Sequence, residues 1–188
     1  MSGPRFPILE HEQMTERQRE VADKIAGGPR GGLRGPFLAL IHHPELADVV
    51  QRVGEHLRYK SALPLPLIEL AILIVARHWT CQFEWFVHAR LARTNTDLPE
   101  ELIQAVQRAA IPPVLTDEQR IVHDFAIGIL RNGTPSDAVY REAEDRFGRQ
   151  GVLDLIATCG YYGFIAMLLN TAQIPLPAGE TSPLREMP

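Results

Sequence analysis

The stretch that decides the fold is IELAILIVARHWTCQFEWFVHARLA, which covers residues 68–92. The apolar run that opens this stretch covers Leu67 to Ala76, with Glu69 as its single exception. This run is too short to span a membrane but suits a buried core helix. The second half of the stretch places a thiol, a carboxylate and an imidazole among aromatic residues. The stretch therefore predicts a core helix followed by a segment with candidate chemistry.

Glu69 is the charged residue inside the apolar run. A buried carboxylate is costly unless it is paired or protonated, and burial alone raises its pKa. One interpretation is a structural ion pair with an arginine such as Arg77 or Arg90. The other is an acid or base whose pKa is tuned by burial.

A polar face is predicted for the second half of the stretch. On a helix, Cys81, Glu84 and His88 stand at positions i, i+3 and i+7, so they share one side. This spacing predicts a helix that buries its other side and gathers the polar groups on the first. The residues predicted on the apolar side are Phe83, Phe86 and Val87.

Glu84 and His88 form an i, i+4 pair, and a carboxylate partner orients an imidazole and raises its pKa. The alternative is a surface Glu–His pair beside a buried cysteine. A metal site is a further option, with a third ligand from His78, His123 or another chain. Because no HExxH motif is present, we predict no metal.

Composition narrows the class of protein. The chain has 188 residues, 45% of them hydrophobic and 22% charged, with a formal net charge of −4, as expected of one soluble globular domain rather than a nucleic-acid-binding protein. The two cysteines form no CxxC pair, and the N-terminus MSGPRFPILEHEQ lacks an export signal pattern. We therefore expect a cytoplasmic location.

Helix signals recur along the chain, and no strand pattern persists, so the predicted class is all-α. Capping boxes at Thr15 with Gln18 and at Thr116 with Gln119 predict helices over residues 16–26 and 117–131. The other predicted helices cover residues 45–59, 67–76 with the stretch that follows, 99–109 and 135–147, and a last apolar helix.

Two of the predicted helices carry informative apolar patterns. Helix 45–59 is predicted from apolar residues at helical spacing. The last helix contains VLDLIATCGYYGFIAMLL, residues 152–169, where Asp154 and two glycines favour a buried helix at a subunit interface over a membrane span. Cys159 in this helix is predicted to be a small buried apolar residue. The apolar residues at helical spacing in helix 45–59 are Leu46, Val49, Val50, Val53 and Leu57.

Residues 68–92 resemble the signature of the carboxymuconolactone decarboxylase family, in the alkylhydroperoxidase D-like superfamily. There a glutamate on one helix precedes a C-x-x-C-x-x-x-H segment on the next. Here Glu69 lies 12 residues before Cys81, and His88 lies seven after it. Residues 34–64 also resemble the family's upstream region. The resemblance implies an alkylhydroperoxidase D-like helical bundle in a single domain that forms a trimer or hexamer.

The resemblance also fixes the predicted boundaries. The helical domain is predicted to cover residues 31–175, preceded by an N-terminal arm and helix over residues 1–30. An irregular tail is predicted over residues 176–188, because this segment is rich in proline.

Glu84 stands where the family pattern has its second cysteine. Without that cysteine, the two-thiol cycle of peroxide reduction cannot run. The resemblance therefore implies a cofactor-independent decarboxylase, or a related proton-transfer enzyme, acting on a small anionic cyclic substrate. In this hypothesis Glu69, Glu84 and His88 handle the proton, and Cys81 lines the site. The residues predicted to hold the substrate, a carboxylate, are Arg34, Arg77, His78 and Trp85.

Two alternatives stay open from the sequence. The first is a thiol-dependent peroxidase that uses Cys81 without a second cysteine, which needs a lowered thiol pKa and an external reductant. The second is a non-catalytic oligomeric binding protein that keeps the fold. No cofactor is predicted in any of the three hypotheses.

Overall fold

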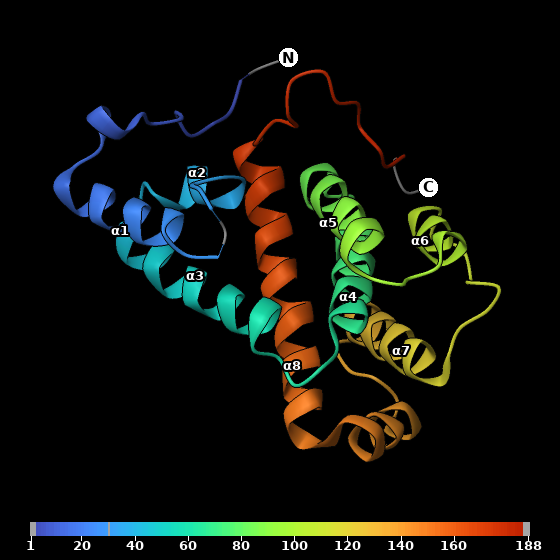
Figure 1. The fold of residues 1–188 in the computed structure, drawn as a ribbon. Helices are drawn as coiled ribbons and strands as arrows, with labels where there is room; N and C mark the ends of the chain where they lie inside the picture. Colours follow the sequence, from blue (N-terminus) through green and yellow to red (C-terminus); the bar gives the residue numbers. More distant parts are fainter. Residues whose placement is uncertain (1–2, 30, 186–188) are drawn as a thin grey trace.

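The computed structural model describes residues 3–29 and 31–185, and every regular element in these ranges is helical. This confirms the predicted all-α class. Figure 1 shows α8 running through the middle of the molecule, with α1 to α3 on one side and α4 to α7 on the other. The elements are a 3-10 turn η1 (His11–Gln13) and the helices α1 (Glu16–Ala26), α2 (Pro36–Leu40), α3 (Pro44–Tyr59), α4 (Leu65–His78), α5 (Gln82–Asn95), α6 (Glu100–Gln107), α7 (Asp117–Asn132) and α8 (Asp137–Ala172).

Both predicted capping boxes are present. The hydroxyl of Thr15 accepts a hydrogen bond from the amide of Gln18, whose side chain accepts one from the amide of Thr15. Thr116 and Gln119 repeat the pair at the start of α7. Each box satisfies amide groups that have no partner within the helix, so the helices begin where these residues stand.

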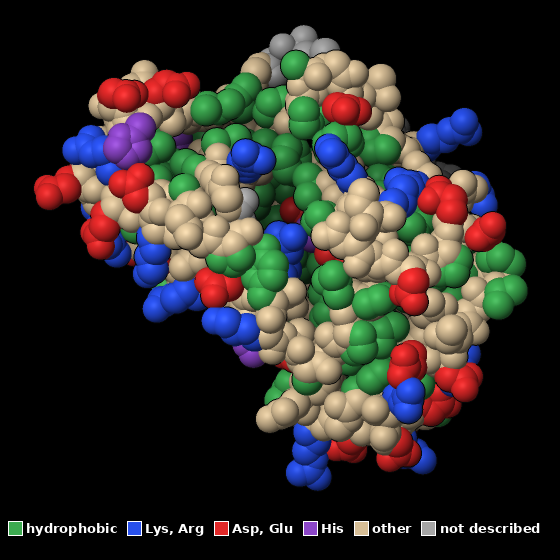
Figure 2. Space-filling view, viewed as in Figure 1, with side chains coloured by type: hydrophobic (Ala, Val, Ile, Leu, Met, Phe, Trp, Pro, Cys, Tyr) green, Lys and Arg blue, Asp and Glu red, His purple; other side chains and the backbone are tan. Residues whose placement is uncertain are grey.

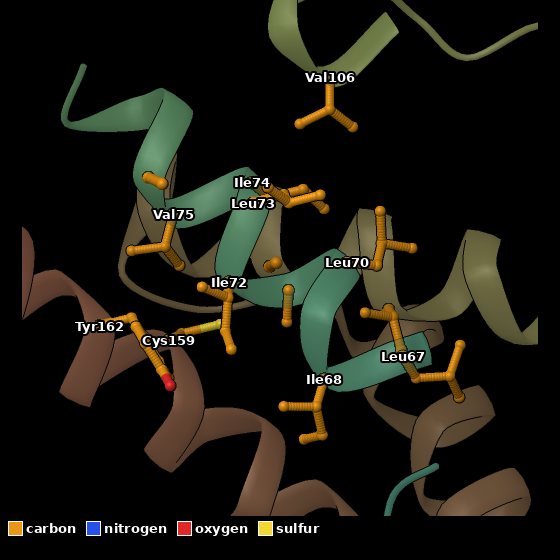
Figure 3. Close-up of a cluster of buried hydrophobic side chains, with 14 of the residues drawn as sticks. Leu67, Ile68, Leu70, Ile72, Leu73, Ile74, Val75, Val106, Cys159 and Tyr162 are labelled. Atoms are coloured by element: carbon orange, nitrogen blue, oxygen red, sulfur yellow. The ribbon is translucent and has the colours of Figure 1, made fainter. Parts of the chain in front are cut away.

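The core forms around α4, which contacts α5, α6, α7 and α8. Every residue from Leu67 to Arg77 is buried, as expected of a helix that is apolar nearly all round. Figure 3 shows Ile72 of α4 facing Cys159 and Tyr162 of α8. Cys159 is buried in this core cluster, as predicted. Because neighbours surround α4, its single carboxylate at Glu69 is buried as well.

The predicted break after Phe147 is a kink inside α8, where Gly148 has a φ of 65°. Beyond it lies the apolar part of the helix. By length and composition α8 could cross a membrane, but half of its most apolar window is buried inside the molecule. Asp154 accepts hydrogen bonds from the amide of Ala62 and the hydroxyl of Ser61, and so holds the loop before α4.

The predicted helix over residues 45–59 is present as α3, but not all of its apolar residues at helical spacing face the core. Leu46, Val49 and Val53 are 41%, 51% and 43% exposed, whereas Val50 and Leu57 are buried. The helix instead packs on α1, α2 and α8 through a face that includes small residues, which let neighbouring backbones approach closely. The other buried residues of α3 are Ala47, Gln51 and Gly54.

The described part of the C-terminal tail is irregular but packed. Gln82 donates to the carbonyl of Leu184 at 2.8 Å and accepts from its amide at 2.8 Å, while the Leu184 side chain is buried. Gln107 donates to the carbonyl of Pro183. The tail therefore ties the start of α5 to α6. The ends of the predicted arm and tail, residues 1–2 and 186–188, and residue 30 lie outside the described ranges, and the predicted domain boundaries stay predictions.

Candidate active site

His88 lies between two carboxylates in the interior of the protein. Its Nδ1 is 2.7 Å from Oε2 of Glu69, and its Nε2 is 3.4 Å from Oε2 of Glu84. All three side chains are buried. Glu69 comes from α4, and the other two come from α5. The structure thus brings together three of the four predicted catalytic residues as one buried ion-paired cluster.

A tight connection between α4 and α5 creates this arrangement. The helix α4 ends at His78, and the amides of Thr80 and Cys81 donate to the carbonyls of Arg77 and Ala76. Thr80 takes a φ of 46°, which lets the chain reverse before α5 begins. The two helices then pack side by side (Figure 1), so that Glu69 on one faces His88 on the other.

The orientation of α5 differs from the prediction. Its polar side faces inward, whereas the predicted apolar side is only half buried. This excludes the interpretation of Glu84 and His88 as a surface pair. The partner of Glu69 is His88 rather than Arg77, which bonds the tail, or Arg90, which is exposed. The residues of the half-buried side are Phe83, Phe86 and Val87.

The two carboxylates control the charge of His88. Burial disfavours its protonated form, but the charge and hydrogen bond of Glu69 and the charge of Glu84 outweigh burial and raise the pKa of His88. Tyr162 of α8 meets the imidazole edge-on at 5.1 Å between ring centroids. Burial raises the pKa of Tyr162 well above 10, so its hydroxyl stays neutral. The two carboxylates therefore favour the protonated form of the imidazole, which lies beside a neutral phenol.

Arg58 is a component that the sequence did not reveal. It lies in the last turn of α3 and is half buried, and its positive charge lowers the pKa of both His88 and Tyr162. Arg58 shares no motif with residues 68–92. Only the packing of α3 and α8 around α4 and α5 brings it near the cluster.

Figure 2 shows the surface over α8 and α5 hollowed, with acidic side-chain atoms visible deep inside. A hollow of this kind gives a small molecule a route toward groups that are otherwise covered. In the described ranges, no three His, Cys, Asp or Glu side chains are arranged to hold a metal ion. The cluster can transfer a proton between the imidazole of His88 and a group placed beside it.

The raised pKa of His88 predicts how stability depends on pH. Protonation of His88 is more favourable in the folded chain than in the unfolded one, where its pKa is about 6.5. Its stabilising contribution is therefore fully present below pH 6.5 and is lost as the pH rises through the folded-state value. We expect the difference in unfolding free energy between the wild type and His88→Asn to shrink above pH 6.5. Urea unfolding at several pH values measures this, and a difference that grows with pH would contradict it.

Cys81 stands at the start of α5 and is fully buried. Burial and the charge of Glu84 raise the pKa of its thiol to about 12, although the amides of Glu84 and Phe83 act in the opposite direction. Burial alone raises the pKa of Cys159 to about 12 as well. Both cysteines are free. At neutral pH each is a thiol, and only the thiolate is a strong nucleophile.

The four residues predicted to hold substrate occupy three different places in the structure. Trp85 is 1% exposed and belongs to the core. Arg34 is exposed in the loop before α2. Arg77 and His78 line a different cavity, together with residues of α6 and α7. Arg77 is separated from Glu69 by helix geometry, because it lies about two turns further along α4.

Comparison with solved structures identifies the fold. The structure superposes on a crystal structure of an alkylhydroperoxidase AhpD core, an uncharacterized peroxidase-related protein from Ralstonia eutropha, with a TM-score of 0.77 and 17% identity over 95% of this chain and 94% of that one. An uncharacterized peroxidase-related protein from a Silicibacter species gives a TM-score of 0.73 and 17% identity over 95% and 96%. The fold is thus the alkylhydroperoxidase D-like helical fold.

One segment of the sequence matches a family model. The model of the carboxymuconolactone decarboxylase family matches residues 44–119, which run from the start of α3 to the first turn of α7 and include the whole cluster. This segment is therefore similar to the family, as the spacing of Glu69, Cys81 and His88 predicted. Comparison with curated proteins gives no significant match.

Proposed function

We propose that this protein is an acid–base enzyme of the carboxymuconolactone decarboxylase type, which removes carbon dioxide from a small cyclic carboxylate without a cofactor. The observation that carries the proposal is His88 held between Glu69 and Glu84 in a buried site. General acid catalysis needs a protonated group whose pKa is close to the working pH. A buried imidazole whose pKa is raised by two carboxylate neighbours is a candidate for such a group.

The chemical step uses these residues as follows. The bond between the ring carbon and the substrate carboxylate breaks, and carbon dioxide leaves. The electron pair that remains is delocalised into the lactone. His88 then donates its proton to the carbon, and solvent returns a proton to the imidazole. Glu69 fixes the ring orientation through the bond at Nδ1, which leaves the proton on Nε2, on the side of Glu84, available for transfer.

A thiol peroxidase that uses Cys81 is the second candidate, since both structural neighbours carry peroxidase-related names. The state of Cys81 weighs against it. A peroxidatic cysteine is exposed and has a lowered pKa, whereas Cys81 is buried and its pKa is raised to about 12. Glu84, which stands at the position of a resolving cysteine, contributes to that increase.

We expect Cys81→Ala to retain at least about a third of wild-type turnover, because a buried thiol with a high pKa takes no part in proton transfer. The assay follows loss of 4-carboxymuconolactone absorbance together with release of carbon dioxide. In parallel, mass spectrometry of the wild-type Cys81 peptide after exposure to a modest excess of peroxide should show an unmodified thiol. Rapid oxidation of Cys81, with loss of lactone turnover in Cys81→Ala, would favour the peroxidase instead.

We also propose that the enzyme works as a homo-oligomer in the cytoplasm. Apolar side chains at helical spacing are exposed on α3, and others are exposed on α8. Contiguous exposed apolar surface of this kind marks interaction sites in soluble proteins. The residues concerned are Leu46, Val49 and Val53 of α3 and Leu153, Ile156 and Met167 of α8.

A further inference from the structure

A second site is suggested by a cavity of about 160 Å³ that lies away from His88. Its walls come from the last turns of α4, from the end of α6 with the segment after it, and from one face of α7. The amides of Ala109 and Ala110 donate to the carbonyls of Val106 and Ala105, which closes α6 and forms one wall. None of Glu69, Glu84 and His88 lines this cavity.

The charged and titratable groups of the lining are all basic. They are Arg77 and His78 of α4, and His123 and Arg131 of α7. Among residues 3–29 and 31–185, no aspartate or glutamate lines the cavity. Burial and the nearby charge of Arg131 lower the pKa of His78, so that this imidazole is neutral at pH 7. The two arginines therefore supply the fixed positive charge.

Arg77 is a buried cation with incomplete partners. Its Nη1 donates to the carbonyl of Arg185 at 2.9 Å and lies 3.5 Å from the hydroxyl of Thr80. Within residues 3–29 and 31–185, its buried Nε has no hydrogen-bond partner, and burial without a neighbouring carboxylate charge lowers the pKa of its guanidinium. Buried charges in proteins are normally paired. An anion bound in the cavity would pair with the charge of Arg77.

Helix ends are a competing reason for basic residues at this place. The C-terminal ends of α4, α6 and α7 each present about half a negative charge, which cations stabilise, and Arg131 lies in the last turn of α7. The charge of the two arginines still exceeds the combined charge of these three helix ends, so a smaller positive excess remains. His123 also lies in the middle of α7, away from the C-terminal end, and is oriented by its 2.9 Å contact with Asp124. The stabilisation of helix ends therefore explains only some of the basic residues that line the cavity.

The apolar walls indicate what kind of anion fits. Ile74, Val106 and Ile127 face the cavity, and Ile111 at its edge is 91% exposed. An engineered protein cavity of about 150 Å³ binds benzene, so this volume suits one aromatic ring or a branched chain of similar size. We propose that the cavity between α4, α6 and α7 binds a small organic carboxylate with an apolar body, whose charge is held by Arg77 and Arg131.

The test is a titration of the full-length protein with benzoate, followed by NMR of 13C-methyl-labelled isoleucines. Ile111 and Ile127 are assigned with the variants Ile111→Val and Ile127→Val. Saturable shifts of both signals are expected, and benzamide, which has the same shape without the charge, should bind at least about tenfold more weakly. Equal binding of benzamide and benzoate, or isoleucine signals that do not shift, would overturn the proposal.

Arg131→Gln is expected to raise the benzoate dissociation constant about fivefold, because Arg131 is exposed and its ion pair is partly screened. The matched control Arg141→Gln removes an exposed charge on α8, outside the cavity, and should leave the constant unchanged. His88→Asn should leave it unchanged too. Equal constants for Arg131→Gln and wild type, or loss of the Ile127 response in His88→Asn, would place benzoate elsewhere and refute the second site.

Discussion

Replacement of His88 by asparagine is expected to reduce lactone turnover about 10²–10⁴-fold, the range that a positioned general acid contributes. Asparagine keeps a polar side chain of similar length next to Glu69 but has no proton to donate at neutral pH. The loss should fall on kcat, because His88 acts on the reacting carbon and the substrate is held by other groups. Initial rates over a range of lactone concentrations measure the effect, with carbon dioxide release as the second readout.

His43→Asn is the matched control for this substitution. His43 is exposed and caps α3 by accepting a hydrogen bond from the amide of Leu46. Asparagine is a preferred residue at that position, so the same chemical change should leave turnover at the wild-type level. Circular dichroism must show that both variants keep the helical fold. If folded His88→Asn turns over the lactone as fast as the wild type, the acid–base proposal is wrong.

Local signals account for most of the fold. The capping boxes at Thr15 and Thr116 fix the starts of α1 and α7, since they act within one helical turn. The apolar run before Arg77 specifies a central helix regardless of which neighbours cover it. The α3 face shows the limit of such signals. Its pattern indicates an apolar stripe, but whether that stripe meets the core or lies exposed depends on how α1, α2 and α8 pack.

The site was predictable as a set of residues but not as a place in the molecule. The spacing of Glu69, Glu84 and His88 identified the cluster, and the structure brings the three together. The inward turn of the polar side of α5 was not predictable, because it depends on Tyr162 and Arg58 approaching from helices distant in sequence. Arg77 and His78 were predicted to hold substrate because they lie near Cys81 in the chain, but they line a separate cavity.

Trp85→Ala is expected to lower the free energy of unfolding by about 3–5 kcal/mol, the usual cost of removing a buried large aromatic side chain. Trp85 is 1% exposed and packs in the cluster around α4. Its loss would leave a cavity between α4 and α5, which together hold the ion-paired cluster. Urea unfolding followed by circular dichroism measures the change, since only one tryptophan, Trp79, would remain for fluorescence.

Trp79→Ala is the matched control, because it removes the same side chain from a position that is 38% exposed, in the turn after α4. The contact of Asn170 with Trp79 uses the backbone carbonyl and survives the substitution. We expect a loss of about 1 kcal/mol or less, as for most partly exposed sites. Equal losses in the two variants would contradict the core position of Trp85. A Trp85→Phe variant of near wild-type stability that binds the lactone weakly would instead support the substrate-binding role predicted from the sequence.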